Sequence, residues 1–432
     1  MKKMSTVELQ IAERARNFKG EALHNLHHFI DARFLQESYK KLNKKSAEGI
    51  DGKTWLEYGK EFPERRESLL AEFKSGRYRA PALRRVYIPK DKHSQRPIDI
   101  ATTEDKVLQE SVRRVLEPIY EEDFKPFSFG FRPKRSQHQA IDYLFKEVSF
   151  GRKHYIIDAD IKNYFGSIDH GILREFLDKR VKDGVIRRMI DKWLKAGVME
   201  RGNISYSEFG SPQGSVISPL LSNVYLHYVL DEWFSEQIQP LLKGQSFIVR
   251  FADDFVLGFT DKSDAERVMA VLPKRFAKFG LTLHPEKTRM IDLNAKRGGN
   301  NRSFDFLGFT HFLSRSLKGY MVLKRKTSSK RLTRAISNVS NYIQSNRHMK
   351  LKDLITALNV KLGGHYNYYG VTFNTRSING FYEAVKRRLF KWLNRRGGKV
   401  KLCWDRFSSL VDKWHPLLKP SIRHSYNSLK RI

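Results

Sequence analysis

The sequence predicts an α+β fold in which short strands and helices mix as far as about residue 315, followed by a largely helical region. Apolar, β-rich runs separated by short polar segments indicate two hairpins, at 84–102 and 246–259. Between the hairpins, apolar residues recur with a helical period, most clearly after Thr103. Beyond Lys324 the strand patterns give way to helical ones, which predicts a second region of different architecture.

The remaining elements follow from local patterns. Residues 6–45 are expected to be helical and basic, and a helix that begins near "KSDAE" is expected to kink at Pro273 and end at Gly280. Helices are also predicted from Ser136, from Ile172 to Val181 and from about Pro219, and short strands at "KHYIIDADI", "LTLHPEKTRMIDL" and "FDFLGFTHF".

The charge of the chain points to a polyanionic partner. With 81 basic and 47 acidic residues, the formal net charge is +34, an excess that self-repels unless the protein works beside nucleic acid. A membrane surface is the weaker alternative. Residues 321–432 hold 25 basic and 4 acidic side chains, with aromatic residues interleaved, as a surface that tracks phosphates and stacks bases requires.

Other classes of protein are disfavoured. No run approaches the roughly 20 apolar residues of a membrane span, and the N-terminus lacks the apolar core of a signal peptide. The single cysteine, Cys403, excludes an internal disulfide framework and a metal site built on paired cysteines. We therefore expect an intracellular protein.

Two aspartate pairs stand out against this basic background. Asp253 and Asp254 lie in the connection of the hairpin at 246–259, and Asp158 and Asp160 lie two apart on a predicted strand, so that they share one face. Clustered carboxylates suit hard divalent cations, with Mg²⁺ the physiological candidate and Mn²⁺ a substitute. An isolated Asp-Asp pair is more often a pair of solvated turn residues, so the wider motif order decides.

That order resembles the reverse transcriptases encoded by group II introns. The resemblance rests on "GIDG", "FSFGFRPKRSQHQAI", "DADIKNYFGSIDH", "GSPQGSVISPLLSNVYLHYVLD", "RFADD", "LHPEKT" and "FDFLGF", and continues in "YEAVKRRLFKWLNRR". It implies an α+β right-hand polymerase, with fingers and palm (antiparallel sheet plus helices) followed by an α-helical thumb/maturase region. The implied domains are an N-terminal extension and start of the fingers at 1–80, fingers and palm at 81–315, and the thumb/maturase region with a basic extension at 316–432.

The resemblance implies a catalytic metal site. Asp160, Asp253 and Asp254 match the metal-binding triad for two Mg²⁺ ions, and Ile161 is included among the metal-binding positions. Asp158 is the alternative to Asp160. Asp160 is preferred because Phe165, five residues after it, then matches the aromatic gate that selects deoxynucleotides in this family.

The same resemblance implies a nucleotide site. Lys90 and Arg96 match a triphosphate-binding pair, with solvated loop charges as the alternative. Gln213 matches a residue that contacts the incoming nucleotide, and Gly214 allows close approach of the backbone. Lys287 is either a general acid for the departing pyrophosphate or only its electrostatic partner.

Nucleic-acid contacts are expected in two places. Arg132 and Arg135 are expected along the template path, with an ion pair within the fingers as the alternative. Residues 395–432 could contact DNA, although a simple extension of the thumb is preferred. In the thumb region, the predicted RNA contacts are Lys386, Arg387, Arg388, Lys391, Arg395 and Arg396.

The predicted function is an RNA-directed DNA polymerase that extends a primer with dNTPs, binds group II intron RNA and assists its splicing and mobility. Its expected partners are an RNA template, a DNA primer or target and dNTPs, with no membrane. The resemblance also implies a place in the bacterial cytoplasm, associated with the nucleoid through DNA. Two alternatives are a splicing-only maturase and a host-domesticated reverse transcriptase used in phage defence or repair. Because the chain lacks paired cysteines, we expect no endonuclease domain and no second-strand cleavage.

Overall fold

The computed structural model describes residues 5–89, 94–200, 202–206, 209–294, 302–397 and 401–425. The chain divides into two compact units. Unit 1 comprises Met1–Ala140, Ala159–Phe255 and Ser263–Arg289, and unit 2 comprises Ile141–Asp158, Val256–Lys262 and Met290–Ile432. The domain boundaries expected near residues 80 and 315 divide the chain in another way, and they stay a prediction.

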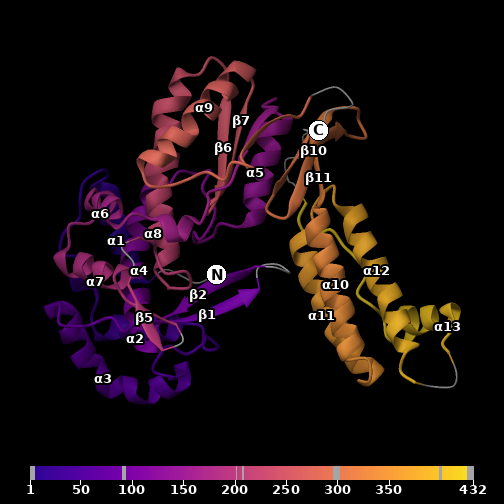
Figure 1. Cartoon of the computed structure of the whole chain (residues 1–432), viewed down its shortest axis with the longest axis horizontal. Coiled ribbons are helices and arrows are strands. Elements are labelled where there is room, and N and C mark those ends of the chain that lie inside the picture. The colour runs from indigo at the N-terminus through magenta and orange to yellow at the C-terminus, as the bar shows by residue number, and fades with distance from the viewer. Residues whose placement is uncertain are drawn as a thin grey trace. The chain divides into compact units, whose positions relative to one another are not determined.

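Helices and strands are mixed along the chain (Figure 1). The helices are α1 Thr6–Asn17, α2 Ala32–Lys41, α3 Trp55–Ser75, α4 Thr103–Asp123, α5 Gln137–Ser149, α6 His170–Asp178, α7 Gly184–Leu194, α8 Ser218–Leu226, α9 Lys262–Lys278, α10 Ser329–Ser345, α11 Leu351–Tyr369, α12 Thr375–Leu393 and α13 Trp404–Ser409. Shorter 3-10 or π turns are η1 Leu26–Phe29, η2 Tyr164–Ser167, η3 His227–Asp231, η4 Trp233–Ile238, η5 Gln239–Leu241 and η6 Leu410–Trp414. The strands are β1 Leu83–Pro89, β2 Gln95–Ile100, β3 Tyr155–Ala159, β4 Val198–Glu200, β5 Asn203–Ser205, β6 Ser246–Phe251, β7 Asp254–Phe259, β8 Arg289–Asp292, β9 Ser303–Phe306, β10 Phe309–Arg315 and β11 Met321–Thr327.

The N-terminal helical stretch is broken into separate pieces. A capping box between Ser5 and Glu8 starts α1, and Asp31 caps the start of α2. Between them, Gly20 and Asn25 adopt positive φ angles, which a right-handed α-helix does not allow. The stretch expected to be helical at 6–45 is therefore helical in separate pieces and not throughout, and α1 and α2 pack separately against α4.

Helix α4 forms the centre of unit 1. Its apolar residues, including Val107, Leu108 and Leu116, are fully buried, as their helical period predicts. It also buries polar side chains. One of them, Arg114, forms an ion pair of 2.7 Å with Glu8 of α1. The N-terminal helix is thus anchored to the core by charge as well as by apolar packing.

The predicted hairpin at 84–102 is confirmed. Strands β1 and β2 pair in antiparallel fashion from Arg84↔Ile100 to Pro89↔Gln95. Strand β4 joins the other edge of β1 in parallel, giving a sheet in the order β2-β1-β4-β5. A second sheet has the order β6-β7-β3-β8, and it carries both aspartate pairs of the sequence at or next to its strands. Helix α9 continues through Pro273 and ends at Lys278, just before Gly280 adopts φ +68°.

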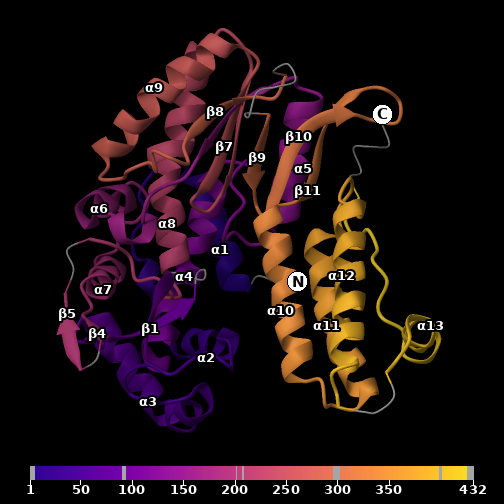
Figure 2. The same cartoon turned by 45° about the vertical axis from the view of Figure 1, so that its right-hand side comes forward.

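Unit 2 contains a three-stranded sheet, β11-β10-β9, and a helical region. Helices α10, α11 and α12 lie side by side (Figures 1 and 2) and share an apolar core that includes Ile343, Leu358 and Leu389. Strand β11 continues to Thr327, and the helical region begins at Ser329, a few residues later than the boundary expected at Lys324. In the described part of the chain, none of the helices combines the length and hydropathy that crossing a membrane requires.

Candidate active site

A tight connection between β6 and β7 carries Asp253. Only Ala252 and Asp253 separate the two strands, and Ala252 adopts φ +57°, the left-handed conformation that such short connections use. Asp253 is half-buried, whereas Asp254 is exposed at the first position of β7. The predicted hairpin is confirmed, with one aspartate in its connection and the other opening its second strand.

Asp160 immediately follows β3 and is fixed through its backbone. Its carbonyl oxygen accepts a 2.7 Å hydrogen bond from the N–H of His284. The turn that starts at His284 brings Lys287 to the same aspartate, with Nζ 2.5 Å from Oδ2 of Asp160. The motifs "DADI" and "HPEKT" therefore meet in space, and an ammonium group partly neutralises the Asp160 carboxylate.

Asp160 and Asp253 act on each other electrostatically. Burial raises the pKa of Asp253, and the charge of Asp160 raises it further, whereas Arg96 and Arg250 lower it. A buried carboxylate that lies beside a second negative charge gains from a nearby cation. Asp158, the competing position, is half-buried within β3.

The carboxylates of this site provide part of what a metal ion requires. Carboxylate oxygens are the preferred ligands of hard divalent cations, and the interacting pair Asp160 and Asp253 fits such an ion. Among the described residues, however, no group of three His, Cys, Asp or Glu side chains is close enough to hold a metal. The structure therefore brings Asp160 and Asp253 within electrostatic range and does not gather Asp254 into a three-carboxylate group. The side chain of Ile161 is buried, and its backbone bridges to Leu283.

An arginine that the sequence reasoning missed supports the Asp253 turn. Arg250 is fully buried and forms a bidentate ion pair with Asp231, at 2.8 and 2.5 Å. The same guanidinium donates to the carbonyl oxygen of Ala252 (3.0 Å) and to Oδ1 of Asn223 (2.9 Å). Asn223 in turn donates to the carbonyl oxygen of Gly130, where an added Cβ would lie 2.2 Å from the nitrogen of Ala252. An arginine directly before "FADD" was the available signal.

The Phe165 turn is joined to the loop that carries Gln213. Phe165 is half-buried in η2, and its carbonyl oxygen accepts a 2.7 Å hydrogen bond from the N–H of Ser211. The N–H of Gly210 donates to the carbonyl oxygen of Ile168 at 2.8 Å. The loop 210–216 therefore begins on the segment that also carries the predicted gate residue.

The other side of this loop rests on β2. The carbonyl oxygen of Gln213 accepts a 2.7 Å hydrogen bond from the N–H of Asp99. Gly214 adopts φ +117°, and a Cβ there would lie 2.8 Å from Cγ2 of Ile98. The glycine is thus required by packing against β2, and close approach to a nucleotide stays a prediction.

Of the two predicted triphosphate ligands, only Arg96 lies in the described part of the chain. Arg96 is exposed in β2, opposite Ile88 of β1, and its positive charge lowers the pKa of Asp253. Lys90 lies outside the described residues.

Arg132 and Arg135 have different environments. The side chain of Arg132 is 3% exposed and bonds both carboxylate oxygens of Glu121 at 2.9 Å. This burial does not fit a template contact and favours the ion-pair alternative within the fingers. Arg135 is half-buried, lies 5.5 Å from the ring of Phe129 and donates to the carbonyl oxygen of Pro126.

The six basic residues of the thumb region also divide into two groups. Lys386 pairs with Asp412 at 3.0 Å, and Arg396 is half-buried and donates to the carbonyl oxygen of Met349. The other four are exposed on or just after α12, and they are Arg387, Arg388, Lys391 and Arg395.

The segment after α12 packs into the thumb region. Phe407, Val411 and Leu417 belong to the apolar core formed by α10, α11 and α12. This packing favours the thumb-extension alternative for the described part of 395–432. Contact with DNA stays a prediction.

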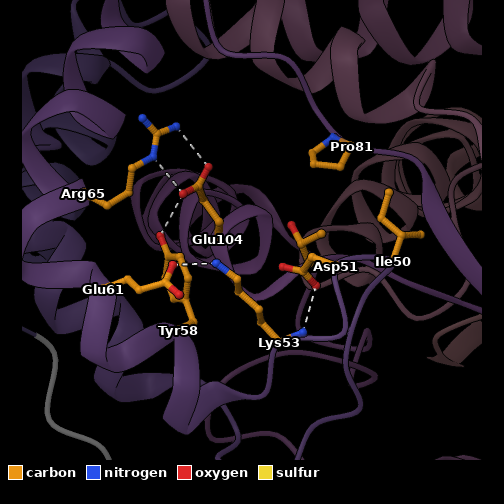
Figure 3. A pocket seen from close by; sticks show the side chains of 9 residues that line it. Ile50, Asp51, Lys53, Tyr58, Glu61, Arg65, Pro81 and Glu104 are labelled. Atoms are coloured by element: carbon orange, nitrogen blue, oxygen red, sulfur yellow. Dashed lines mark hydrogen bonds and ion pairs between the residues drawn. The ribbon is translucent and has the colours of Figure 1, made fainter.

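A cavity of about 490 Å³ in unit 1 contains none of these residues (Figure 3). Its cations are already paired, because Arg65 bonds Glu104 and Lys53 lies 2.6 Å from Glu61. Tyr58 also donates to Glu104. The described residues that line this cavity therefore offer no free cation to a phosphate group.

Comparison with known proteins agrees with this architecture, a right-hand polymerase fold followed by a helical region. Residues 88–311 match the family described as reverse transcriptase (RNA-dependent DNA polymerase). Residues 330–409 match the group II intron, maturase-specific domain. The chain belongs to the reverse transcriptase family, in the group encoded by group II introns. Domains of this family depend in general on a divalent metal ion.

Several curated relatives are similar to parts of this chain. Group II intron-encoded protein LtrA of Lactococcus lactis subsp. cremoris is 40% identical over 165 residues, 38% of this chain and 27% of that protein. Protein YkfC of Escherichia coli (strain K12) is 32% identical over 286 residues, 58% of this chain and 72% of that protein. Maturase-like protein 1 of Euglena gracilis is 26% identical over 372 residues, 80% of this chain and 73% of that protein. The stretch of this chain that matches LtrA covers only about a quarter of the length of that protein.

Proposed function

We propose that this protein is an RNA-directed DNA polymerase that extends a primer with dNTPs on an RNA template. We further propose that it binds group II intron RNA and assists splicing and mobility of the intron. The observation that carries the polymerase proposal is the electrostatic pairing of Asp160 with Asp253, beside the Lys287 ammonium. Family membership and the matched maturase domain support the RNA partner and the splicing role.

In this proposal Asp160 and Asp253, with Asp254 adjacent, hold Mg²⁺. Two such ions would supply activation of the primer 3′-hydroxyl and stabilisation of the leaving pyrophosphate. Lys287 provides a positive charge next to Asp160 and a proton for the leaving group. Arg96, together with Lys90, binds the triphosphate through charge-assisted hydrogen bonds.

The sugar and base of the incoming nucleotide meet the loop 210–216 and the Phe165 turn. The ring of Phe165 is proposed to collide with a 2′-hydroxyl and so to exclude ribonucleotides. Gln213 contacts the nucleotide, and the hydrogen bond between Ser211 and Phe165 keeps the two elements in register. Arg387, Arg388, Lys391 and Arg395 contact RNA phosphates.

The test is primer extension by Asp253→Asn. The substitution removes one charge of the interacting pair and should abolish extension while RNA affinity stays nearly unchanged, because the RNA contacts lie elsewhere. Asp178→Asn, which makes the same charge change at an exposed position in α6, is the matched control and should retain wild-type extension. Extension by Asp253→Asn at the rate of the control would refute the assignment.

A further inference from the structure

Behind the loop that carries Gln213 lies a buried chain of hydrogen bonds from α4. Oε1 of Gln109 accepts from the hydroxyl of Ser215 at 2.6 Å and from the backbone N–H of Val216 at 2.9 Å. Nε2 of Gln109 donates to Oδ2 of Asp105 at 2.8 Å. Gln109 and Asp105 are each 1% exposed, so that no solvent can replace these partners.

At the other end of this series of hydrogen bonds, two aromatic side chains fix Asp105. Its Oδ1 accepts from Nε1 of Trp193 at 2.7 Å and from the hydroxyl of Tyr78 at 3.3 Å. Its backbone N–H is capped by the side chain of Thr102 at the start of α4. Gln109, Trp193 and Tyr78 all donate to the carboxyl group, so Asp105 acts as the acceptor.

The chemistry of the partners fixes which way the Gln109 amide points. The backbone N–H of Val216 can only donate, so the oxygen of the amide must face it. Asp105, ionised near neutral pH because burial raises its pKa only to about 6, accepts the NH₂ group on the opposite side. A carboxylate at position 105 therefore holds the amide in the one orientation that accepts from the loop.

We propose that Asp105 and Gln109 are positioning residues that set the backbone of Gln213 and Gly214 for the incoming nucleotide. The inference rests on the proposed polymerase function. The loop is held at three points: by Phe165 and Ile168 at its start, by Asp99 of β2 at Gln213, and by Gln109 just after Gly214. Neither positioning residue touches the nucleotide in this proposal; both act through the loop.

Exchange of the two side-chain types tests the proposal. Asp105→Asn sets an NH₂ group against Nε2 of Gln109, which forces the amide to turn its NH₂ group toward Val216. Gln109→Glu sets two carboxylates against each other. The double variant Asp105→Asn/Gln109→Glu restores every donor and acceptor. In it the new amide at position 105 donates to the new carboxylate at position 109, which still accepts from Ser215 and Val216.

The measurement is KM for dNTP and kcat in primer extension on an RNA template. Each single variant should raise KM on the order of fivefold to tenfold, with a smaller effect on kcat and on primer–template affinity. The double variant should return KM to within about twofold of wild type. Single variants with wild-type KM, or a double variant whose losses simply add, would overturn the proposal.

A second readout needs no catalysis and separates this inference from the polymerase proposal. Hydrogen–deuterium exchange of the peptide 210–217 should be faster in both single variants and slow again in the double variant. If the single variants fail to fold, Ser215→Ala, which removes one donor only, should still raise both KM and the exchange rate. Absence of extension by the wild-type chain refutes the polymerase proposal, whereas unchanged exchange in all variants refutes the positioning role.

Discussion

Arg250 and Asp231 form a bidentate ion pair with both side chains fully buried, and the same guanidinium holds the carbonyl oxygen of Ala252, one residue before Asp253. The left-handed conformation of Ala252 is thereby supported by a rigid, enclosed partner. The position of Asp253 thus depends on a buried ion pair that supports the turn from behind.

Breaking this pair should destabilise the protein strongly. Asp231→Asn leaves the buried Arg250 charge unbalanced, which costs about 3–5 kcal/mol in the free energy of unfolding. The control is Arg33→Met, since Arg33 forms an exposed pair with Glu37 at 3.5 Å that contributes about 1 kcal/mol or less. Chemical denaturation measures both. Equal losses for the two variants would contradict the structural role assigned to Arg250.

Lys287 can be tested as a proton donor separately from its charge. Lys287→Arg keeps a cation beside Asp160, but the pKa of a guanidinium is too high for it to give up a proton readily. If Lys287 is a general acid, Lys287→Arg and Lys287→Gln should both lower kcat by about 10²- to 10⁴-fold. Single-turnover extension under saturating dNTP provides the comparison. A near-wild-type rate for Lys287→Arg would leave only the electrostatic role.

The exposed basic residues of the thumb region should control the salt dependence of RNA binding. Removal of each phosphate contact should reduce the slope of log K against log salt concentration by about 0.7 to 0.9. The slope is measured by titrating RNA at several salt concentrations. The four residues to neutralise together are Arg387, Arg388, Lys391 and Arg395.

The matched control for this experiment is the pair Lys386 and Arg396. Their cations already have partners within the protein, Asp412 and the carbonyl oxygen of Met349. Neutralising these two should therefore change the slope less per residue than neutralising the exposed four. An unaltered slope in the fourfold variant would mean that the phosphate contacts lie elsewhere.

Asp105 should make stability depend on pH. Burial raises its pKa from 3.8 to about 6, so the folded state binds the proton more tightly than the unfolded state. Its contribution to stability is fully present below about pH 4 and is lost as the pH rises through about 6. The size of this effect is about 3 kcal/mol.

Asp105→Asn removes this titration. The free energy of unfolding of the variant, relative to wild type, should therefore rise by up to about 3 kcal/mol between about pH 4 and pH 7. Denaturation curves at each pH measure this difference, and Asp178→Asn serves as the exposed control. A difference that does not change with pH would show that Asp105 keeps an ordinary pKa in the folded chain.

Local patterns in the sequence determined most elements of this fold. Apolar, β-rich runs on either side of Asp253 predicted the β6–β7 hairpin, because two such runs joined by a short polar segment favour paired strands. Helical periodicity predicted α4, because apolar residues that recur every three to four positions form one buried face of a helix. Motif order also located Asp160, Asp253 and Lys287, of which the structure brings Asp160 close to Lys287 and within electrostatic range of Asp253.

Only the tertiary structure decided which polar side chains are buried. Asp105 and Gln109 lie on a helix whose apolar period says nothing of polar neighbours, and their partners Trp193 and Ser215 are distant in sequence. Arg132 is likewise a charged residue that the sequence places on the surface, but its side chain is buried and paired with Glu121. Periodicity reports the face of an element that is buried, whereas a buried polar group depends on the donor or acceptor that another element brings to it.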